Sequence, residues 1–280
     1  MPGINFDPAY AYYDKTRGYA PGVAEAIRDT ILNKIQSVAN SSPRFLELGV
    51  GTGRIALPFI QANYNYVGVD LSLAMMEQLR GKANPNSDTS NYSYHLLQAD
   101  ITRLPFREAS FDVALMVHVL HLVDNWQVAL CETQRVLRKT GGYLFIGNDE
   151  PSKDISHSTT YLVKKKWDAI LQEFGINRNA LLPGLNERAL NRDELIEAFL
   201  QQLGAQTERI NLLEHTTPPL SPRMMAQRHL ERMYSSDWQI PDHIHASASR
   251  HLENWLNTEC PEPDRAFSIL STFKAIIARW

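Results

Sequence analysis

The 280-residue chain is predicted to fold as an α/β protein around a doubly wound, mostly parallel sheet. Two observations carry this prediction. Short apolar segments alternate with helical patterns from Arg44 to Asn148, which is typical of a parallel sheet with helices on both faces. A glycine-rich turn, Gly49 to Gly53, directly follows the first apolar segment, as it does where such sheets bind nucleotides. Beyond residue 150 helical patterns dominate, which indicates a second, mostly helical part.

The elements follow from local patterns in chain order. In the N-terminal segment, Val23, Ile27, Ile31 and Ile35 recur every fourth position and predict one buried helical face. Five strands are then expected, at residues 44–49, 66–70, 94–99, 111–117 and 143–146. Helices are expected up to about residue 61 and at 72–80, 125–138, 159–174, 191–203, 221–234 and 242–258. Residues 207–212 and 268–278 have the pattern of two further strands.

Composition excludes several classes of protein. Charged residues make up 21% of the chain, the net charge is −3, and the longest basic run is Lys164–Lys166, so a nucleic-acid partner is not expected. No apolar stretch is long enough to span a bilayer and no leader is recognised in residues 1–19, which favours a cytoplasmic protein without membrane contact. Cys131 and Cys260 are too few for a disulfide framework, and no metal site is expected.

The glycine-rich turn and two acidic residues indicate a site for an adenosine-containing ligand. Gly49, Gly51 and Gly53 alternate between a strand and a helix, where the missing Cβ lets the backbone turn sharply against a ligand. Asp70 ends the next strand, where a carboxylate can accept both ribose hydroxyls. Asp100 follows the third strand on the same edge and could accept an adenine amino group.

A nicotinamide dinucleotide is the alternative ligand, because Gly51, Gly53 and Ala56 also have the dinucleotide spacing. Three observations favour a different adenosine ligand. Glu47 would place a negative group beside a pyrophosphate, Asp100 adds a second acid, and no set of residues for hydride transfer follows the fourth strand.

Residues 44–148 resemble class I S-adenosylmethionine-dependent methyltransferases, specifically the type 11 group. The matching stretches, in the family's order, are Glu47–Arg54, Val67–Met76, Gln98–Phe106, Phe111–Asp124 and Arg135–Gly142. The opening Tyr12–Tyr19 also resembles a leader found in one bacterial branch that acts on small molecules. The resemblance implies S-adenosylmethionine as the methyl donor.

The resemblance also implies a Rossmann-like sheet of seven strands with an antiparallel last strand and a mostly helical cap. The N-terminal cap segment would then be 1–43 and the donor-binding core 44–150, with cap insertions at 151–190 and 217–262. Residues 191–216 would form a core helix and the sixth strand, and 263–280 the last strand.

Individual donor contacts are implied in the same way. Gly49 and Gly51 would contact the methionine part, Asp70 the ribose and Asp100 the adenine, with Leu71 and Ile101 packing on the base. Tyr13 and Arg17 would close over the donor. The complete set of donor-binding candidates is Tyr13, Arg17, Glu47, Gly49, Gly51, Asp70, Leu71, Asp100, Ile101 and Val117.

His118 is the candidate catalytic residue, because it follows the fourth strand near the expected position of the donor methyl group. It would act as a base or orient the acceptor, or it would only form part of the pocket wall. The acceptor would be an oxygen, from a hydroxyl or carboxylate, or a nitrogen of a small molecule or short peptide. A nicotinamide-dependent oxidoreductase and a catalytically silent donor-binding protein are the alternatives, and the oligomeric state is not predicted.

Overall fold

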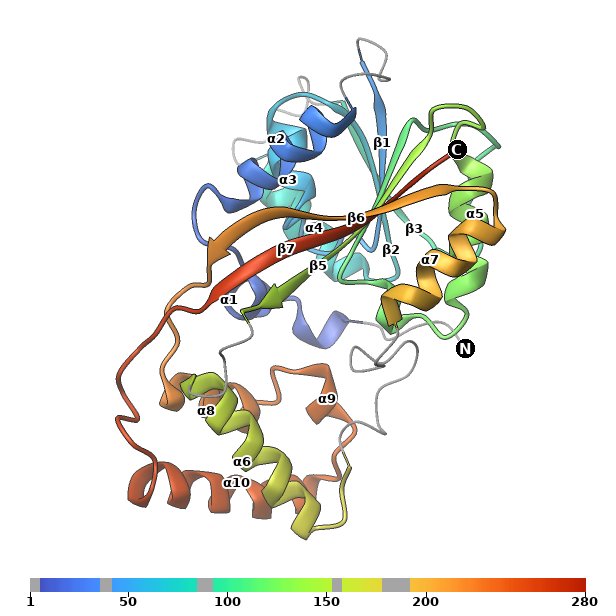
Figure 1. Ribbon diagram of the computed structural model, residues 1–280. Coiled ribbons are helices and arrows are strands. Elements are labelled where there is room, and N and C mark those ends of the chain that lie inside the picture. The colour runs from blue at the N-terminus through green and yellow to red at the C-terminus, as the bar shows by residue number, and fades with distance from the viewer. Residues whose placement is uncertain (1–5, 36–41, 85–92, 153–157, 178–191) are drawn as a thin grey trace.

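The computed structural model describes residues 6–35, 42–84, 93–152, 158–177 and 192–280. Its centre is a seven-stranded sheet in the order β3-β2-β1-β4-β5-β7-β6 (Figure 1). The strands are β1 (Arg44–Leu48), β2 (Asn65–Asp70), β3 (Tyr94–Gln98), β4 (Val113–Val117), β5 (Tyr143–Pro151), β6 (Gln206–Thr216) and β7 (Leu270–Arg279). Neighbours among β1–β5 pair in parallel, and β7 runs antiparallel to both β5 and β6. The predicted α/β class with seven strands is confirmed.

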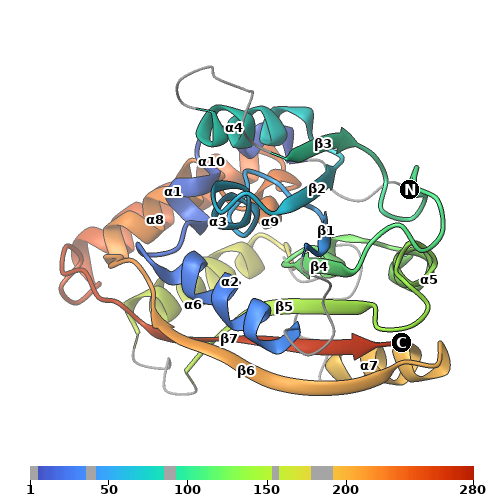
Figure 2. The same cartoon turned by 90° about the horizontal axis from the view of Figure 1, so that it is seen from above.

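Helices cover both faces of the sheet (Figures 1 and 2). On one face Ile27, Phe59 and Met76, from α2, α3 and α4, belong to one buried cluster. On the other face Leu130 of α5 and Leu200 of α7 belong to a second buried cluster. The bounds are α2 (Val23–Ile35), α3 (Ala56–Gln61), α4 (Leu73–Ala83), α5 (Trp126–Val136) and α7 (Arg192–Gln202). The sheet is therefore doubly wound, as its alternating sequence pattern predicted.

A separate group of helices packs below the sheet in Figure 1. It comprises α6 (Thr159–Glu173), α8 (Pro222–Leu230), α9 (Ser235–Trp238) and α10 (Asp242–Thr258). These helices have a core of their own, built around Trp167 and Leu252. The single helix expected at 221–234 is instead interrupted, because Arg232 adopts a left-handed conformation with φ of 51°. The N-terminal turns η1 (Asp7–Ala9) and α1 (Tyr13–Arg17) adjoin this group, because Phe6 packs against Trp238 and Arg17 against Tyr234.

Strand β5 is longer than the sequence predicted. We expected it to end at Ile146, where the apolar run stops, but it continues to Pro151 because β7 pairs with it along its whole length. The strand therefore carries Asp149 beyond the apolar part of the sheet. Parts of the expected insertion 151–190, namely 153–157 and 178–190, lie outside the described residues. None of the described helices is long and apolar enough to cross a membrane.

Candidate functional site

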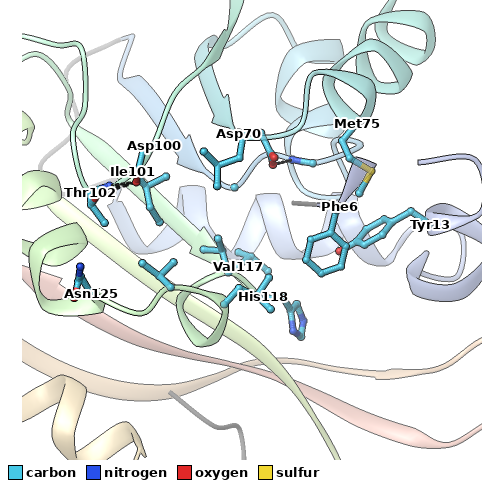
Figure 3. Close-up of a pocket in the computed structure, with 16 residues that line it drawn as sticks. Phe6, Tyr13, Asp70, Met75, Asp100, Ile101, Thr102, Val117, His118 and Asn125 are labelled. Atoms are coloured by element: carbon cyan, nitrogen blue, oxygen red, sulfur yellow. Dashed lines mark hydrogen bonds between the residues drawn. The ribbon is translucent and has the colours of Figure 1, made fainter. Parts of the chain in front are cut away.

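A pocket opens at the carboxyl ends of β1, β2 and β4 (Figure 3). Nine of the eleven residues proposed from the sequence line it, and these are Tyr13, Gly49, Gly51, Asp70, Leu71, Asp100, Ile101, Val117 and His118. The structure thus brings together residues that lie far apart along the chain, because parallel strands end at one edge of the sheet.

The glycine-rich turn forms one wall of this pocket. Gly49 and Gly51 have positive φ values of 77° and 52°, which side chains rarely adopt. A Cβ on Gly49 would lie 2.5 Å from a methyl group of Val119, so the turn leaves no room for a side chain there. A Cβ on Gly51 would meet no protein atom within 4 Å. The backbone at Gly51 therefore borders open space that a ligand can fill.

Asp70 and Asp100 stand on neighbouring strand ends with different environments. Asp70 accepts hydrogen bonds from the backbone N–H groups of Gly51 and Ser72, both at 2.8 Å. Burial raises the pKa of Asp70, and these two N–H groups oppose that shift. Asp100 accepts the backbone N–H and the hydroxyl of Thr102, both on Oδ1 at 2.8 Å, so its Oδ2 can accept from a ligand.

Two residues proposed from the sequence do not line the pocket. Glu47 is buried inside the sheet, where the hydroxyl of Tyr66 donates to it at 2.7 Å. Its burial raises the pKa of Glu47 to about 8, which favours the protonated carboxyl at neutral pH, so its charge is a weak reason to exclude a pyrophosphate. The guanidinium of Arg17 lies over the ring of Tyr234, 5.1 Å from its centre, rather than at the pocket. Neither residue is among those that line the pocket.

The N-terminal segment supplies the aromatic side of the pocket. Phe6 lines the pocket and meets the ring of Tyr13 edge-on, with 6.0 Å between ring centres. Phe6 also packs against Trp238 of α9, with 5.3 Å between ring centres. Sequence reasoning missed Phe6, because an isolated aromatic residue outside any periodic pattern gives no signal.

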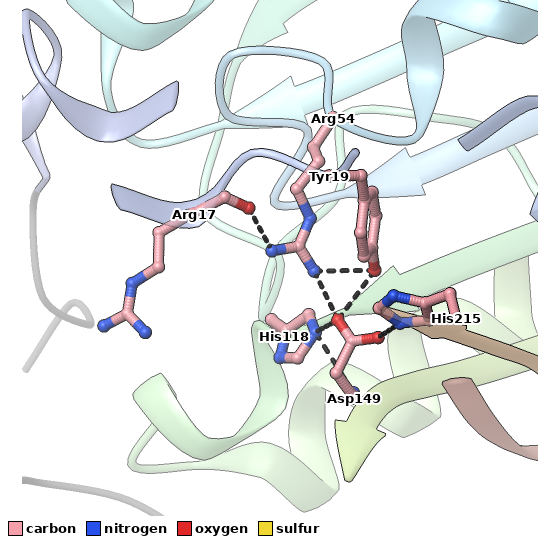
Figure 4. A network of polar contacts seen from close by, with 6 residues as sticks. All are labelled: Arg17, Tyr19, Arg54, His118, Asp149 and His215. Carbon is pink, nitrogen blue, oxygen red and sulfur yellow. Dashed lines mark hydrogen bonds and ion pairs between the residues drawn. The ribbon is translucent and has the colours of Figure 1, made fainter. Parts of the chain in front are cut away.

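A polar network centred on Asp149 lies beside the pocket (Figure 4). Its Oδ2 accepts from the hydroxyl of Tyr19 at 2.8 Å and from Nη2 of Arg54 at 3.0 Å, and it lies 2.8 Å from Nε2 of His118. Its Oδ1 lies 2.8 Å from Nε2 of His215. Burial alone would raise the pKa of Asp149, but the contacts with His118, Arg54 and His215 outweigh it and hold the pKa well below its usual range.

Asp149 was not among the residues proposed from the sequence, although a signal was present. It follows an apolar segment as Asp70 and Asp100 do, and the same rule for strand ends would have selected it. Tyr19, Arg54 and His215 gave no such signal, because only the fold brings them to one carboxylate.

The sheet and its pocket define a class of protein, an α/β domain that binds a small molecule at the ends of its parallel strands. Residues 46–146 match the family described as methyltransferase domain. They are therefore a class I S-adenosylmethionine-dependent methyltransferase domain, and the resemblance stated from the sequence is confirmed.

Individual relatives agree with this family. A demethylmenaquinone methyltransferase of Chlamydia trachomatis is 31% identical over 165 residues, which cover 58% of this chain and 66% of that protein. A malonyl-[acyl-carrier protein] O-methyltransferase of Legionella pneumophila is 28% identical over 125 residues, 44% of this chain and 42% of that protein. The chain thus matches less than two thirds of the length of either relative.

The fold also resembles a solved structure, a putative methyltransferase from an antibiotic biosynthesis pathway of Anabaena variabilis. The two share 15% identity with a TM-score of 0.56, over 89% of this chain and 96% of that one. At this identity the likeness concerns the fold alone.

Proposed function

We propose that the protein transfers a methyl group from S-adenosylmethionine to an oxygen or nitrogen of a small molecule or short peptide. One observation carries this proposal, namely that the Gly49–Gly53 turn, Asp70 and Asp100 end three neighbouring strands and line one pocket. Asp70 would accept the ribose hydroxyls and Asp100 the adenine amino group, with Leu71 and Ile101 beside the base. Gly49 and Gly51 would border the methionine part.

The main task of the protein in this reaction would be to position the donor and the acceptor. The donor supplies a methyl group on a positively charged sulfur, which already makes that methyl reactive. Holding two reactants in line within a closed pocket can lower the barrier by about 7–11 kcal/mol. Tyr13 and Phe6 on one side and Val117 and His118 on the other would exclude water around the methyl group. Substrate choice would depend on the cap, because the fold itself specifies no acceptor.

The substitution Asp70→Ala tests the donor site. Charge-assisted hydrogen bonds contribute roughly 1.5–3 kcal/mol each, so this variant should bind S-adenosylhomocysteine at least about tenfold more weakly in calorimetry. Asp112→Ala is the matched control. Asp112 is another buried carboxylate of the sheet, held 2.9 Å from Arg138, but it precedes β4 and lies at the opposite edge.

The control should retain wild-type affinity, and NAD should bind neither protein. Unchanged binding by a folded Asp70→Ala variant, as judged by circular dichroism, would rule out the ribose assignment. Binding of NAD in place of S-adenosylhomocysteine would rule out the proposed function.

A further inference from the structure

His118 is held in an unusual conformation by its neighbour strand. It follows the last residue of β4 with a φ of 53°, which is rare for residues other than glycine. Its backbone N–H donates to the carbonyl of Gly147 at 3.1 Å, two residues before Asp149 on β5. The pairing of β4 with β5 therefore fixes the backbone of both His118 and Asp149. Strained conformations of this kind concentrate at functional sites.

The contact between His118 and Asp149 determines which ring nitrogen carries the proton. Nε2 of His118 lies 2.8 Å from the carboxylate Oδ2 and 3.3 Å from the backbone N–H of Asp149. Nε2 cannot donate to the first group and accept from the second at once. Because the carboxylate is ionised and the shorter contact requires a proton between the two atoms, Nε2–H donates to Oδ2. The basic lone pair of the ring is then on Nδ1.

The other members of the network hold the carboxylate in place. Arg54, in the turn before α3, and Tyr19, in the N-terminal segment, both donate to the same Oδ2. Nε2 of His215 on β6 lies 2.8 Å from Oδ1, and because an ionised carboxylate only accepts, Nε2 donates in this contact. Asp149 thus receives donors from four segments of the chain, and its two oxygens cannot turn away from His118.

We propose that Asp149 is a positioning residue that holds His118 as a general base with Nδ1 as the basic atom, and that the acceptor enters as a neutral hydroxyl of the phenol or enol class. This inference rests on the proposed function. Asp149 does not touch the substrate, whereas His118 lines the pocket.

The proposed step balances in atoms and charge. The acceptor's O–H proton passes to Nδ1 of His118 while its oxygen forms the bond to the methyl carbon. The methyl–sulfur bond breaks with its electron pair left on sulfur, giving the methyl ether and S-adenosylhomocysteine. The imidazolium that forms is stabilised by the Asp149 carboxylate, and its proton later leaves to solvent.

A base of this kind discriminates among acceptors. A neutral hydroxyl is a poor nucleophile, so removing its proton during transfer accelerates the reaction. A carboxylate is already ionised at neutral pH, and a neutral amine attacks through its lone pair before it loses a proton. A carboxylate would also meet the charges of Asp70 and Asp100 on the same lining. The geometry therefore favours the hydroxyl.

The first test measures the tautomer of His118 directly. Full-length protein labelled with ¹⁵N-histidine is saturated with S-adenosylhomocysteine, and the His118 signals are assigned by comparison with His118→Gln. We expect a neutral ring protonated at Nε2 in the wild type and at Nδ1 in Asp149→Ala, where the backbone N–H of residue 149 remains as the partner of Nε2. The control Asp112→Ala should match the wild type. A wild-type ring protonated at Nδ1, or an Asp149→Ala variant with an unchanged tautomer, would overturn the inference.

The second test measures the acceptor class, with radiolabelled S-adenosylmethionine and two probes, 4-methylphenol and benzoate. We expect methylation of the phenol, falling about 10²–10⁴-fold in Asp149→Asn while calorimetry shows comparable S-adenosylhomocysteine affinity. Methylation of benzoate in preference to the phenol, unaffected by Asp149→Asn, would overturn the inference alone. Loss of S-adenosylhomocysteine binding in the wild type would instead overturn the proposed function. If the Asp149 variants fail to fold, the tautomer of His118 measured in the wild type still decides whether the inference holds.

Discussion

At the scale of single residues, Glu47 shows how burial changes the chemistry of an acid. It lies on β1, at the centre of the sheet, and only 3% of its surface is exposed. Removing a carboxylate from water penalises its charged form, and the single hydrogen bond from Tyr66 offsets only part of that cost. Its side chain thus lies in the core, although its position in the glycine motif suggested contact with the ligand.

This burial predicts a pH dependence of stability. The pKa of Glu47 rises from 4.5 to about 8 on folding, so its favourable contribution is complete below pH 4.5 and is lost as the pH rises through 8. Since each pKa unit corresponds to about 1.4 kcal/mol, we expect the free energy of unfolding to fall by a few kcal/mol over this range. In Glu47→Gln this loss should be absent. Denaturant titrations between pH 5 and 9 measure it.

The control is Glu253→Gln, which changes an exposed acid on α10 and should retain the wild-type pH profile. If Glu47→Gln retained that profile as well, the protonated state of Glu47 at neutral pH would be wrong.

At the scale of elements, the turn between β1 and α3 contains one glycine that borders the pocket and another that packs against a helix. Gly51 and Gly53 both adopt positive φ, 52° and 83°. A Cβ on Gly51 meets only open space, whereas one on Gly53 would lie 2.2 Å from Cδ1 of Leu79, a fully buried residue of α4. The first glycine borders the pocket, and the second lets the turn pack against α4.

A pair of alanine substitutions should therefore give opposite results. Both introduce a similar backbone strain of about 1–2 kcal/mol, so the difference between them reports the surroundings of each Cβ. Gly51→Ala should retain most of its stability but bind S-adenosylhomocysteine at least about tenfold more weakly. Gly53→Ala should lose a further 1–3 kcal/mol, roughly, from overpacking against Leu79. Thermal unfolding and calorimetry on both variants measure the two effects, and equal losses of stability would contradict this assignment.

At the scale of the whole molecule, the N-terminal segment joins the sheet to the helical cap. Asp14 of α1 accepts from the hydroxyl of Thr52 at 2.5 Å and pairs with Lys82 at 2.8 Å, and both partners belong to the part of the chain that forms the sheet and its helices. On the other side Arg228 of α8 donates to the carbonyl of Lys15 at 2.9 Å. Residues more than two hundred positions apart therefore hold the segment that contributes Phe6 and Tyr13 to the pocket.

Removing this link should weaken the site from a distance. Arg228→Ala should increase amide hydrogen exchange over residues 12–18 and weaken S-adenosylhomocysteine binding by about two- to tenfold, because the closed segment is then less populated. Arg223→Ala is the control, since Arg223 lies on the same helix but pairs with Asp264 at 2.6 Å. Equal exchange in the two variants would show that Arg228 does not hold the segment.

The sequence by itself determined the class of the fold and the main part of the pocket. Alternating strand and helix patterns predict a parallel sheet, and parallel strands end at one edge, so Asp70 and Asp100 could be assigned to the same site without coordinates. The glycine turn was recognisable because positive φ values strongly favour one residue type. These features depend on local spacing, which a sequence records directly.

Only the tertiary structure decided which partners the polar side chains contact. Glu47 faces the core and not a ligand because neighbouring elements bury β1 from both sides. The guanidinium of Arg17 packs over the ring of Tyr234, a residue of the cap that is distant in sequence. The Asp149 carboxylate gathers partners from the N-terminal segment, the glycine turn, β4 and β6. Hydrogen bonds between distant segments leave no periodic pattern, because they depend on where the backbone places each side chain and not on spacing along the chain.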